Sequence, residues 1–136
     1  MLDKIVGVES STEYVADASR LADRYGNPGV RVLATPHLVA LAETECLRCV
    51  AEHLERGWST VGIRLDVRHL AATPEGMKFT MKAVLRQADR RRLVFDVEAR
   101  DETELVFAGT HERVMVETKK FLENAEQKRP GKQPIP

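Results

Sequence analysis

The sequence predicts an α+β fold in which one antiparallel sheet wraps around a single long helix. Two observations predict it. Apolar residues recur at helical spacing over positions 36–54, and after Gly57 they alternate with polar residues as far as about position 117. A helix and a sheet patterned in this way each have one apolar face, and packing the two faces together gives the chain its core.

The length and charge of the chain restrict its class. Its 136 residues suffice for one domain, which we place at residues 1–122, and the Lys-, Gln- and Pro-rich remainder at 123–136 is expected to be disordered. The 21 basic and 21 acidic residues give a formal net charge of zero, which argues against nucleic acid as a partner. The sequence contains neither an apolar run of the ~20 residues that span a bilayer nor a secretory signal. We therefore expect a cytoplasmic protein without membrane contacts.

The first part of the chain is expected to form a strand at residues 9–16 and a short helix at 17–25. Asp17 suits the N-cap of this helix, because a side-chain oxygen can accept a hydrogen bond from a free amide of the first turn. The stretch 25–29, Tyr-Gly-Asn-Pro-Gly, contains the residues that end helices and form turns. The short helix is therefore expected to end there, before the long one begins.

Thr35 and Pro36 mark the start of the long helix. Threonine suits the N-cap, and proline suits the first helical position, where the amide that it lacks would have no partner. At about 100° per residue, one face of this helix is apolar and carries Val39, Ala42, Cys46, Leu47, Cys49, Val50 and Leu54. Glu43 falls on that face, whereas Glu45 falls on the polar one. An acidic side chain on the face expected to be buried is a candidate functional residue.

The alternation after Gly57 predicts four strands, near residues 60–69, 77–86, 93–99 and 105–117. The residues expected on the apolar side of the first of them are Val61, Ile63, Leu65, Val67 and His69. One helix on one small sheet leaves strand edges unpaired, and pairing two such sheets in a homodimer would cover them.

Two ionisable side chains, Glu43 and His69, lie on faces that the patterns place inside. Burying a carboxylate costs several kcal/mol unless it is paired or hydrogen-bonded. Either residue alone is equally well explained as a satisfied core group, but the two together, on elements that should face each other, favour a site. Thr35 alone would be a plain cap. Next to such a site, its hydroxyl and the amides of the helix start form a candidate oxyanion site, to which His37 could contribute.

Three segments resemble the fluoroacetyl-CoA thioesterase family of hotdog proteins, namely residues 34–43 (ATPHLVALAE), 67–76 (VRHLAATPEG) and 109–113 (GTHER). The resemblance spans roughly residues 30–120 and implies a hotdog fold, a dimer with the active site at the subunit interface, and no metal. The family's catalytic threonine, glutamate and histidine correspond to Thr35, Glu43 and His69. The glycine whose backbone helps to hold the acyl group corresponds to Gly62, and an arginine near the pocket corresponds to Arg113.

The resemblance implies an acyl-CoA thioesterase that uses no cofactor besides its coenzyme A thioester substrate. The family's fluoroacetyl-specific member covers its pocket with bulky aromatics, where this chain has the glycines of residues 25–29. The sequence therefore does not support selectivity for a fluorinated acyl group, and we expect a short or otherwise small acyl-CoA thioester as substrate. Glu43 would attack the thioester directly or activate a water, with His69 transferring protons. The alternatives are a non-catalytic acyl-CoA-binding protein and a hotdog hydratase or dehydratase. The assembly is a dimer or a dimer of dimers.

Two further motifs are better explained without chemistry. Cys46 and Cys49 match Cys-x-x-Cys with His53 one turn later, but both lie in mid-helix, where a redox thiolate lacks the stabilisation of a helix start. A zinc site would need a fourth ligand, so small core residues are the preferred interpretation. The arginine run at residues 90–92 is interpreted as a solvated turn, with a contact to the phosphates of coenzyme A as the alternative.

Overall fold

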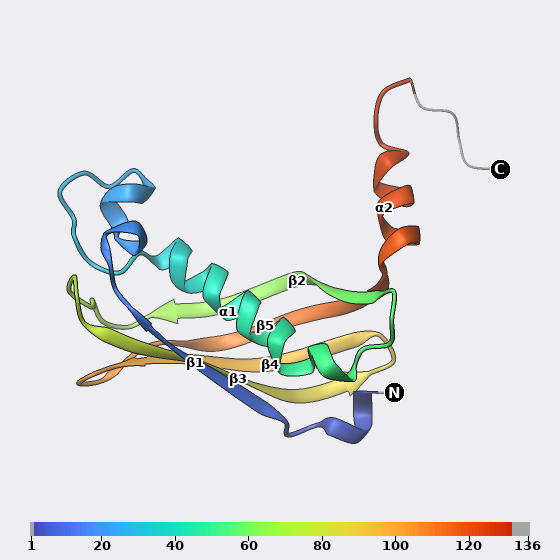
Figure 1. Cartoon of the computed structure of the whole chain (residues 1–136), viewed down its shortest axis with the longest axis horizontal. Coiled ribbons are helices and arrows are strands. Elements are labelled where there is room, and N and C mark those ends of the chain that lie inside the picture. Colours follow the sequence, from blue (N-terminus) through green and yellow to red (C-terminus); the bar gives the residue numbers. More distant parts are fainter. Residues whose placement is uncertain (1, 132–136) are drawn as a thin grey trace.

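The structure is a computed structural model that describes residues 2–131 (Figure 1). Its helices and strands follow the order β1 (Glu9–Val15), α1 (Thr35–Val50), β2 (Trp58–His69), β3 (Lys78–Asp89), β4 (Arg92–Asp101), β5 (Leu105–Glu117) and α2 (Thr118–Glu126). Short 3₁₀ segments lie at Leu2–Ile5, Ala18–Arg20, Ala22–Tyr25 and Ala51–His53.

The five strands form one antiparallel sheet in the order β1-β3-β4-β5-β2, and α1 lies across one of its faces (Figure 1). This arrangement confirms the predicted helix on an antiparallel sheet. The edges of the sheet are β1 and β2. The described residues contain no helix long and apolar enough to cross a membrane.

The core lies between α1 and the central strands. The fully buried side chains that fill it include Leu38, Ala42, Cys46, Val50, Phe79, Met81, Leu85, Phe95 and Phe107. Cys46 and Cys49 are free thiols, both buried among these residues. Burial strongly raises the pKa of the Cys46 thiol, so it is neutral and unreactive. The interpretation of both cysteines as core residues is therefore confirmed.

The buried face of α1 differs from the predicted one. Leu38 and Glu45 are completely buried, whereas Val39 and Leu47 are only partly so, and the Glu43 side chain is 46% exposed. The assignment of Glu45 to the polar face is therefore wrong. The Ser10 hydroxyl of β1 donates a hydrogen bond to the Glu45 carboxylate, and Arg48 Nη1 lies 3.3 Å from its other oxygen. These partners compensate for the loss of hydration.

A β-bulge interrupts β2. The register with β5 shifts between Gly62 and Arg64, so that the alternation of side chains changes phase at Ile63. Gly62 consequently faces α1, on the same side of the sheet as Leu65 and His69, and Ile63 is 54% exposed. The expected single apolar side of this strand is therefore wrong for Val61 and Ile63, because strict alternation contains no extra residue.

The segment before α1 and the C-terminal segment also differ from the predictions. The expected helix at 17–25 is two 3₁₀ segments separated by Leu21, which is buried and bridges to Leu33. Asp17 does cap the first of them by accepting from the Ser19 amide at 3.0 Å. The expected disordered tail from residue 123 includes the last turn of α2, and residues 132–136 lie outside the described part. Helix α2 projects from the body beyond the β2 edge (Figure 1).

Candidate active site

The start of α1 and the end of β2 bring Thr35 and His69 together. Thr35 Oγ1 lies 2.6 Å from His69 Nδ1. The N-cap of α1 is Ala34, whose carbonyl accepts from the amides of His37 and Leu38 at 3.1 and 3.0 Å. The prediction that Thr35 is the cap is therefore wrong by one residue, because its hydroxyl binds the imidazole of another element.

The two ring nitrogens of His69 differ, because Nδ1 contacts Thr35 and Nε2 has no hydrogen-bond partner in the described residues. Its Nε2 is buried and makes no hydrogen bond of normal geometry within the described residues. Burial lowers the pKa of His69, although the Ala71 backbone opposes the shift, so the ring is neutral at neutral pH. Together with Thr35 it borders a depression of about 430 Å³, whose other lining residues are Leu70, Ala71 and Ala72. A neutral imidazole beside an open depression can accept or deliver a proton there.

Glu43 lies in a second cluster, about 12 Å further along α1 at 1.5 Å per residue. Its Oε2 is 3.9 Å from Nη1 of Arg113, which is itself buried. Arg113 is held by Thr60, since its Nε donates to the hydroxyl at 2.7 Å and its Nη2 to the carbonyl at 2.8 Å. Burial lowers the pKa of Arg113 while Glu43 opposes that shift. The carboxylate is therefore the only acidic group that compensates this buried cation within 4 Å in residues 2–131.

His111 completes this cluster, and sequence reasoning gave it no role. Its Nδ1 lies 2.8 Å from the Arg64 carbonyl and its Nε2 lies 3.1 Å from Arg113 Nη1. Burial lowers the pKa of His111, and the positive charge of Arg113 lowers it further. A Cβ on Gly62 would lie 3.0 Å from His111 Cε1, so only glycine leaves room for the ring. The inward alternation of His111 and Arg113 along β5 was the available signal.

The residues before α1 form a polar contact over the helix start. Arg20 Nε donates to His37 Nε2 at 3.1 Å, and the Tyr25 hydroxyl lies 2.7 Å from His37 Nδ1. Burial lowers the pKa of His37 and the nearby Arg20 lowers it further. His37 thus binds the segment that precedes the helix. Both of its ring nitrogens are engaged there, so it is not available to an oxyanion.

The structure therefore groups the five predicted site residues into two clusters. Thr35 pairs with His69, whereas Glu43 lies with Arg113 near Gly62 and His111. No direct bond joins the two clusters within residues 2–131 of one chain. In the same part of the chain, no group of three or more His, Cys, Asp or Glu is arranged to hold a metal ion.

Comparisons with known proteins identify relatives of this chain. The sequence profile of the fluoroacetyl-CoA-specific thioesterases matches residues 16–119. The fluoroacetyl-CoA thioesterase of Streptantibioticus cattleyicolor is 40% identical over 100 residues, which are 74% of this chain and 72% of that protein. A solved structure of a fluoroacetyl-CoA thioesterase, 34% identical, has a TM-score of 0.85 and covers 92% of this chain and 97% of its own.

A more distant protein shares the fold. A hot-dog-like protein from Thermanaerovibrio acidaminovorans is 20% identical and has a TM-score of 0.88, over 96% of this chain and 98% of its own. The predicted hotdog fold is therefore confirmed.

Proposed function

The protein belongs to the fluoroacetyl-CoA-specific thioesterase family, and on this premise we propose that it hydrolyses a small acyl-CoA thioester at a site completed by a second copy of the chain. The observation that carries the proposal is the Thr35–His69 pair, which borders an open depression and whose buried Nε2 has no partner in residues 2–131. Structures of the related thioesterase have been solved with fluoroacetate and CoA, and with acetyl-CoA.

In the proposed reaction, Thr35 polarises the carbonyl of the thioester. The amide hydrogens of His37 and Leu38 already bond to the Ala34 carbonyl, and Pro36 has no amide hydrogen. We therefore assign the role of donor at the helix start to the Thr35 hydroxyl. If His69 Nδ1–H donates to Thr35 Oγ1, the hydroxyl proton is free for the carbonyl oxygen. The lone pair of Nε2 is then free for a proton.

The carboxylate of Glu43 supplies the nucleophile, either by attacking the carbonyl to form an anhydride or by deprotonating a water. In both cases Nη1 of Arg113 lies 3.9 Å from this carboxylate. On either route coenzyme A leaves as the thiolate. His69 Nε2 accepts the proton that becomes available when water reacts, from the water that hydrolyses the anhydride or from the Glu43 carboxyl that deprotonated the water, and passes it to the thiolate. Single-turnover hydrolysis in H₂¹⁸O separates the two routes, because only an anhydride can leave ¹⁸O in the peptide that contains Glu43.

A second copy of the chain is proposed to bring the two clusters together. Strand β2 is an unpaired edge of 12 residues; Ile63 within it is 54% exposed, and Leu70, directly after its end, is 52% exposed. Antiparallel pairing of two such strands around a two-fold axis covers both edges. It also places the His69 end of one strand beside the Trp58 end of the other, so the partner's His69 approaches the Glu43 cluster from that end.

The substrate class follows from the residues over the site. The segment 25–29 contributes one aromatic, Tyr25, whose hydroxyl is bound to His37, and glycines at positions 26 and 29. We therefore propose a small acyl group without selection for fluorine.

The test is release of free thiol from a panel of acyl-CoA thioesters. We expect hydrolysis of the shortest members, and Glu43→Gln should reduce kcat by at least about 100-fold, a typical contribution of acid–base or nucleophilic groups, while acyl-CoA still binds. Full activity of Glu43→Gln would remove Glu43 from the mechanism. Hydration of crotonyl-CoA without thiol release would indicate a hydratase instead, and binding of acyl-CoA without turnover would indicate a carrier.

A further inference from the structure

The three arginines of the turn between β3 and β4 have different environments. Arg92 Nη2 pairs with Glu112 at 2.7 Å, and Arg90 occupies the left-handed turn position with a φ of 58°. Arg91 instead lies over the Trp58 ring, with its Cζ 4.8 Å from the ring centroid. No carboxylate lies within 4 Å of its guanidinium in residues 2–131. Arg91 is therefore a positioned cation whose charge is available to a ligand.

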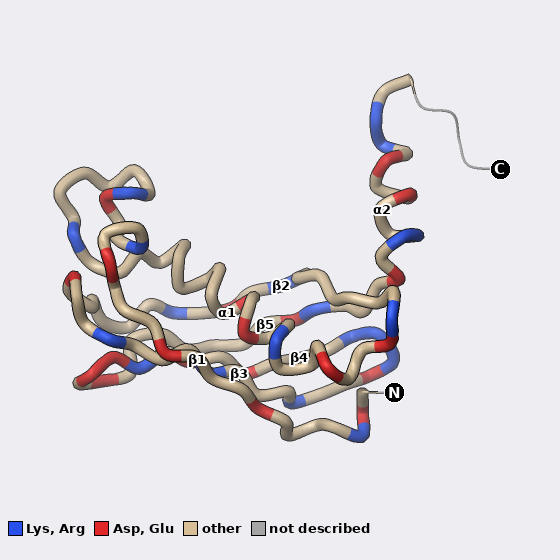
Figure 2. The backbone as a smooth tube through the Cα atoms, in the orientation of Figure 1, with Lys and Arg blue, Asp and Glu red and all other residues tan. Residues whose placement is uncertain are grey.

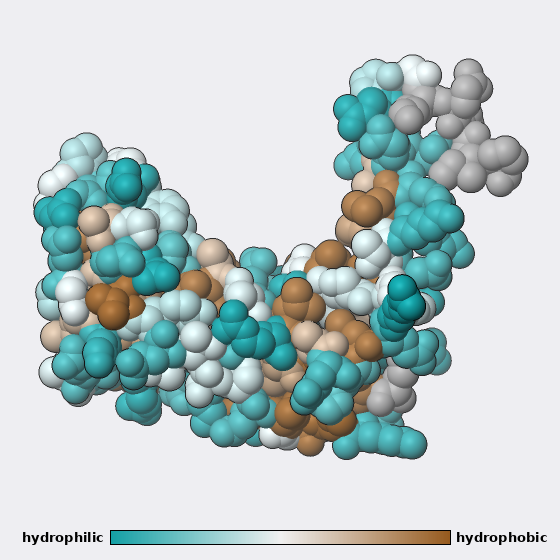
Figure 3. Space-filling model, in the orientation of Figure 1, coloured by the Kyte–Doolittle hydropathy of each residue, from teal (hydrophilic) through white to brown (hydrophobic). Residues whose placement is uncertain are grey.

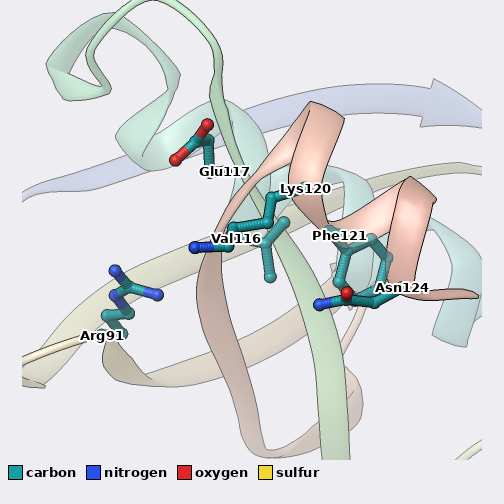
Figure 4. A pocket seen from close by; sticks show the side chains of 6 residues that line it. All are labelled: Arg91, Val116, Glu117, Lys120, Phe121 and Asn124. Atoms are coloured by element: carbon teal, nitrogen blue, oxygen red, sulfur yellow. The ribbon is translucent and has the colours of Figure 1, made fainter. Parts of the chain in front are cut away.

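Arg91 borders a groove of about 250 Å³ where α2 leaves the sheet (Figure 4). The other lining residues are Val116, Glu117, Lys120, Phe121 and Asn124. In Figure 4 the Lys120 ammonium and Arg91 guanidinium lie on one side of Val116, and Phe121 and Asn124 lie on the other. Lys120 also has no ion pair in the described chain, and Phe121 is 40% exposed. With one carboxylate, Glu117, the groove has a net positive charge.

The surroundings of the groove reinforce this pattern. Figure 2 shows basic segments from the β3–β4 turn and from the first turn of α2 at the same end of the molecule. Figure 3 shows apolar surface at the base of α2, next to hydrophilic side chains. Cations, an exposed aromatic ring and a side-chain amide in one groove form the set of groups that binds a phosphorylated nucleotide.

We propose that this groove binds the nucleotide end of the coenzyme A thioester whose acyl group is hydrolysed between Glu43 of the same chain and the partner's His69. The inference rests on the proposed function. Arg91 and Lys120 meet the phosphates, Phe121 contacts the adenine ring, and the Asn124 amide is in reach of the base edge. The arginine turn thereby gains a specific role for one of its three members.

The length of β2 decides which reaction centre the groove serves. Glu117, at the groove, pairs with Trp58 at the start of β2, whereas His69 ends that strand. The 11 residue steps from Trp58 to His69 span roughly 36 Å at 3.3 Å per residue, too far for one pantetheine arm to bridge. Two-fold pairing of β2 strands places the groove of one subunit beside the His69 end of the other.

The test compares acyl-CoA with the matching acyl-pantetheine, which carries the same thioester without the nucleotide. We expect Arg91→Ala and Lys120→Ala each to raise KM for acyl-CoA about tenfold, the effect of losing one charge-assisted hydrogen bond. The same variants should leave KM for acyl-pantetheine and both kcat values within about twofold. Lys119→Ala is the matched control, because Lys119 lies in the same turn but does not line the groove.

Mixed dimers test the assignment across subunits. A His69→Ala chain is co-expressed with an Arg91→Ala/Lys120→Ala chain under two different tags, and the heterodimer is purified. If the groove serves the partner, the one intact reaction centre faces an intact groove and KM for acyl-CoA is that of the unmodified protein. If the groove serves its own chain, the heterodimer retains the raised KM and the proposal is overturned.

The remaining outcomes separate this inference from the proposed function. If neither thioester is hydrolysed, the proposed function fails, and calorimetry of CoA against pantetheine still tests the groove. Equal KM changes for both substrates, or none, would overturn the groove assignment. A variant that dissociates the dimer without changing the KM ratio would overturn it too, because the groove would then be a subunit contact.

Discussion

At the scale of single residues, the site depends on histidines that stay neutral. His69 and His111 both have a lowered pKa, and burial is the largest cause for each. Each ring accepts or donates at defined atoms, so a second proton would break an existing bond or place a charge in a poorly hydrated position. Because the folded pKa is lowered, the neutral form is favoured on folding. The stability that it contributes is present above the unfolded pKa of about 6.5 and is lost as the pH falls from there through the lower folded pKa.

The pH dependence of hydrolysis follows from His69. Its neutral ring holds Thr35 and keeps Nε2 free for a proton. We expect kcat/KM to fall on the acid side with a midpoint below the ordinary histidine pKa of about 6.5, because burial lowers the pKa of His69. The profile should be measured between about pH 5 and 8, and the histidine ring protons should be titrated by NMR with His69→Ala to assign the signal. A midpoint above 6.5 would contradict the proposed role of burial.

Gly62 offers a test of the space beside His111. A methyl group there would lie 3.0 Å from Cε1, and the ring cannot yield easily because both nitrogens are engaged, by Arg64 and Arg113. We expect Gly62→Ala to cost about 1–3 kcal/mol of unfolding free energy, the usual cost of overpacking. It should also lower kcat, because displacement of Arg113 moves the charge beside Glu43.

Chemical denaturation and initial rates measure the two effects of Gly62→Ala. Asp66→Ala is the control, because Asp66 is exposed on the same strand. A Gly62→Ala protein as stable and as active as this control would show that the ring has room to move.

At the scale of elements, Glu45 joins edge strand β1 to helix α1. Ser10 donates to its carboxylate, and Arg48, 3.3 Å from that carboxylate, also donates to Thr12 at 2.5 Å. Removal of the carboxylate leaves these groups without their acceptor. We expect Glu45→Ala to cost about 1–3 kcal/mol, while Glu45→Gln, which keeps an acceptor oxygen, should cost less.

Urea unfolding of these variants provides the measurement. Glu52→Ala is the control, because Glu52 is exposed. Its carboxylate has one possible ion partner in the described chain, His53 Nε2 at 3.6 Å. Its effect should stay within about 0.5 kcal/mol, as for most surface substitutions. Equal losses for Glu45→Ala and Glu52→Ala would show that the buried contact does not stabilise β1.

Sequence patterns predicted those features of the elements that depend on neighbouring residues. The start of α1 follows from Pro36, and the strands follow from their alternation. The patterns failed where a residue far away in the sequence determines the burial or the contact of a side chain. The burial of Glu45 depends on Ser10, 35 positions away, and the Thr35 hydroxyl turns to His69, 34 positions away. Periodicity contains no information about such contacts.

The same limit applies to the site. The family resemblance predicted that Thr35 and His69 belong to one site, and the structure places their side chains in contact. Glu43 was expected beside His69, but α1 separates Glu43 from Thr35 by two turns. A bulge cannot be predicted from alternation, so the contact of Gly62 with His111 was not foreseen.

At the scale of the whole molecule, the two sheet edges differ in their suitability for a partner. Strand β1 has seven residues, and its outer positions include the charged side chains of Glu9 and Glu13. Charges on a short edge strand discourage pairing. Strand β2 has 12 residues and an exposed Ile63, and α2 extends beyond it (Figure 1). The molecule therefore favours association through β2.

A lysine at each edge distinguishes these surfaces. Ile63→Lys places a charge in the β2 edge, and we expect it to dissociate the proposed dimer and to lower activity in proportion, because in that dimer the Glu43 cluster depends on the partner's His69. Val15→Lys is the matched control at the β1 edge, where Val15 is 41% exposed, and it should leave the assembly intact. Sedimentation velocity and activity should be followed over the same range of protein concentration. An active monomer in the Ile63→Lys variant would show that one chain assembles the whole site, and dissociation by Val15→Lys alone would place the interface at β1.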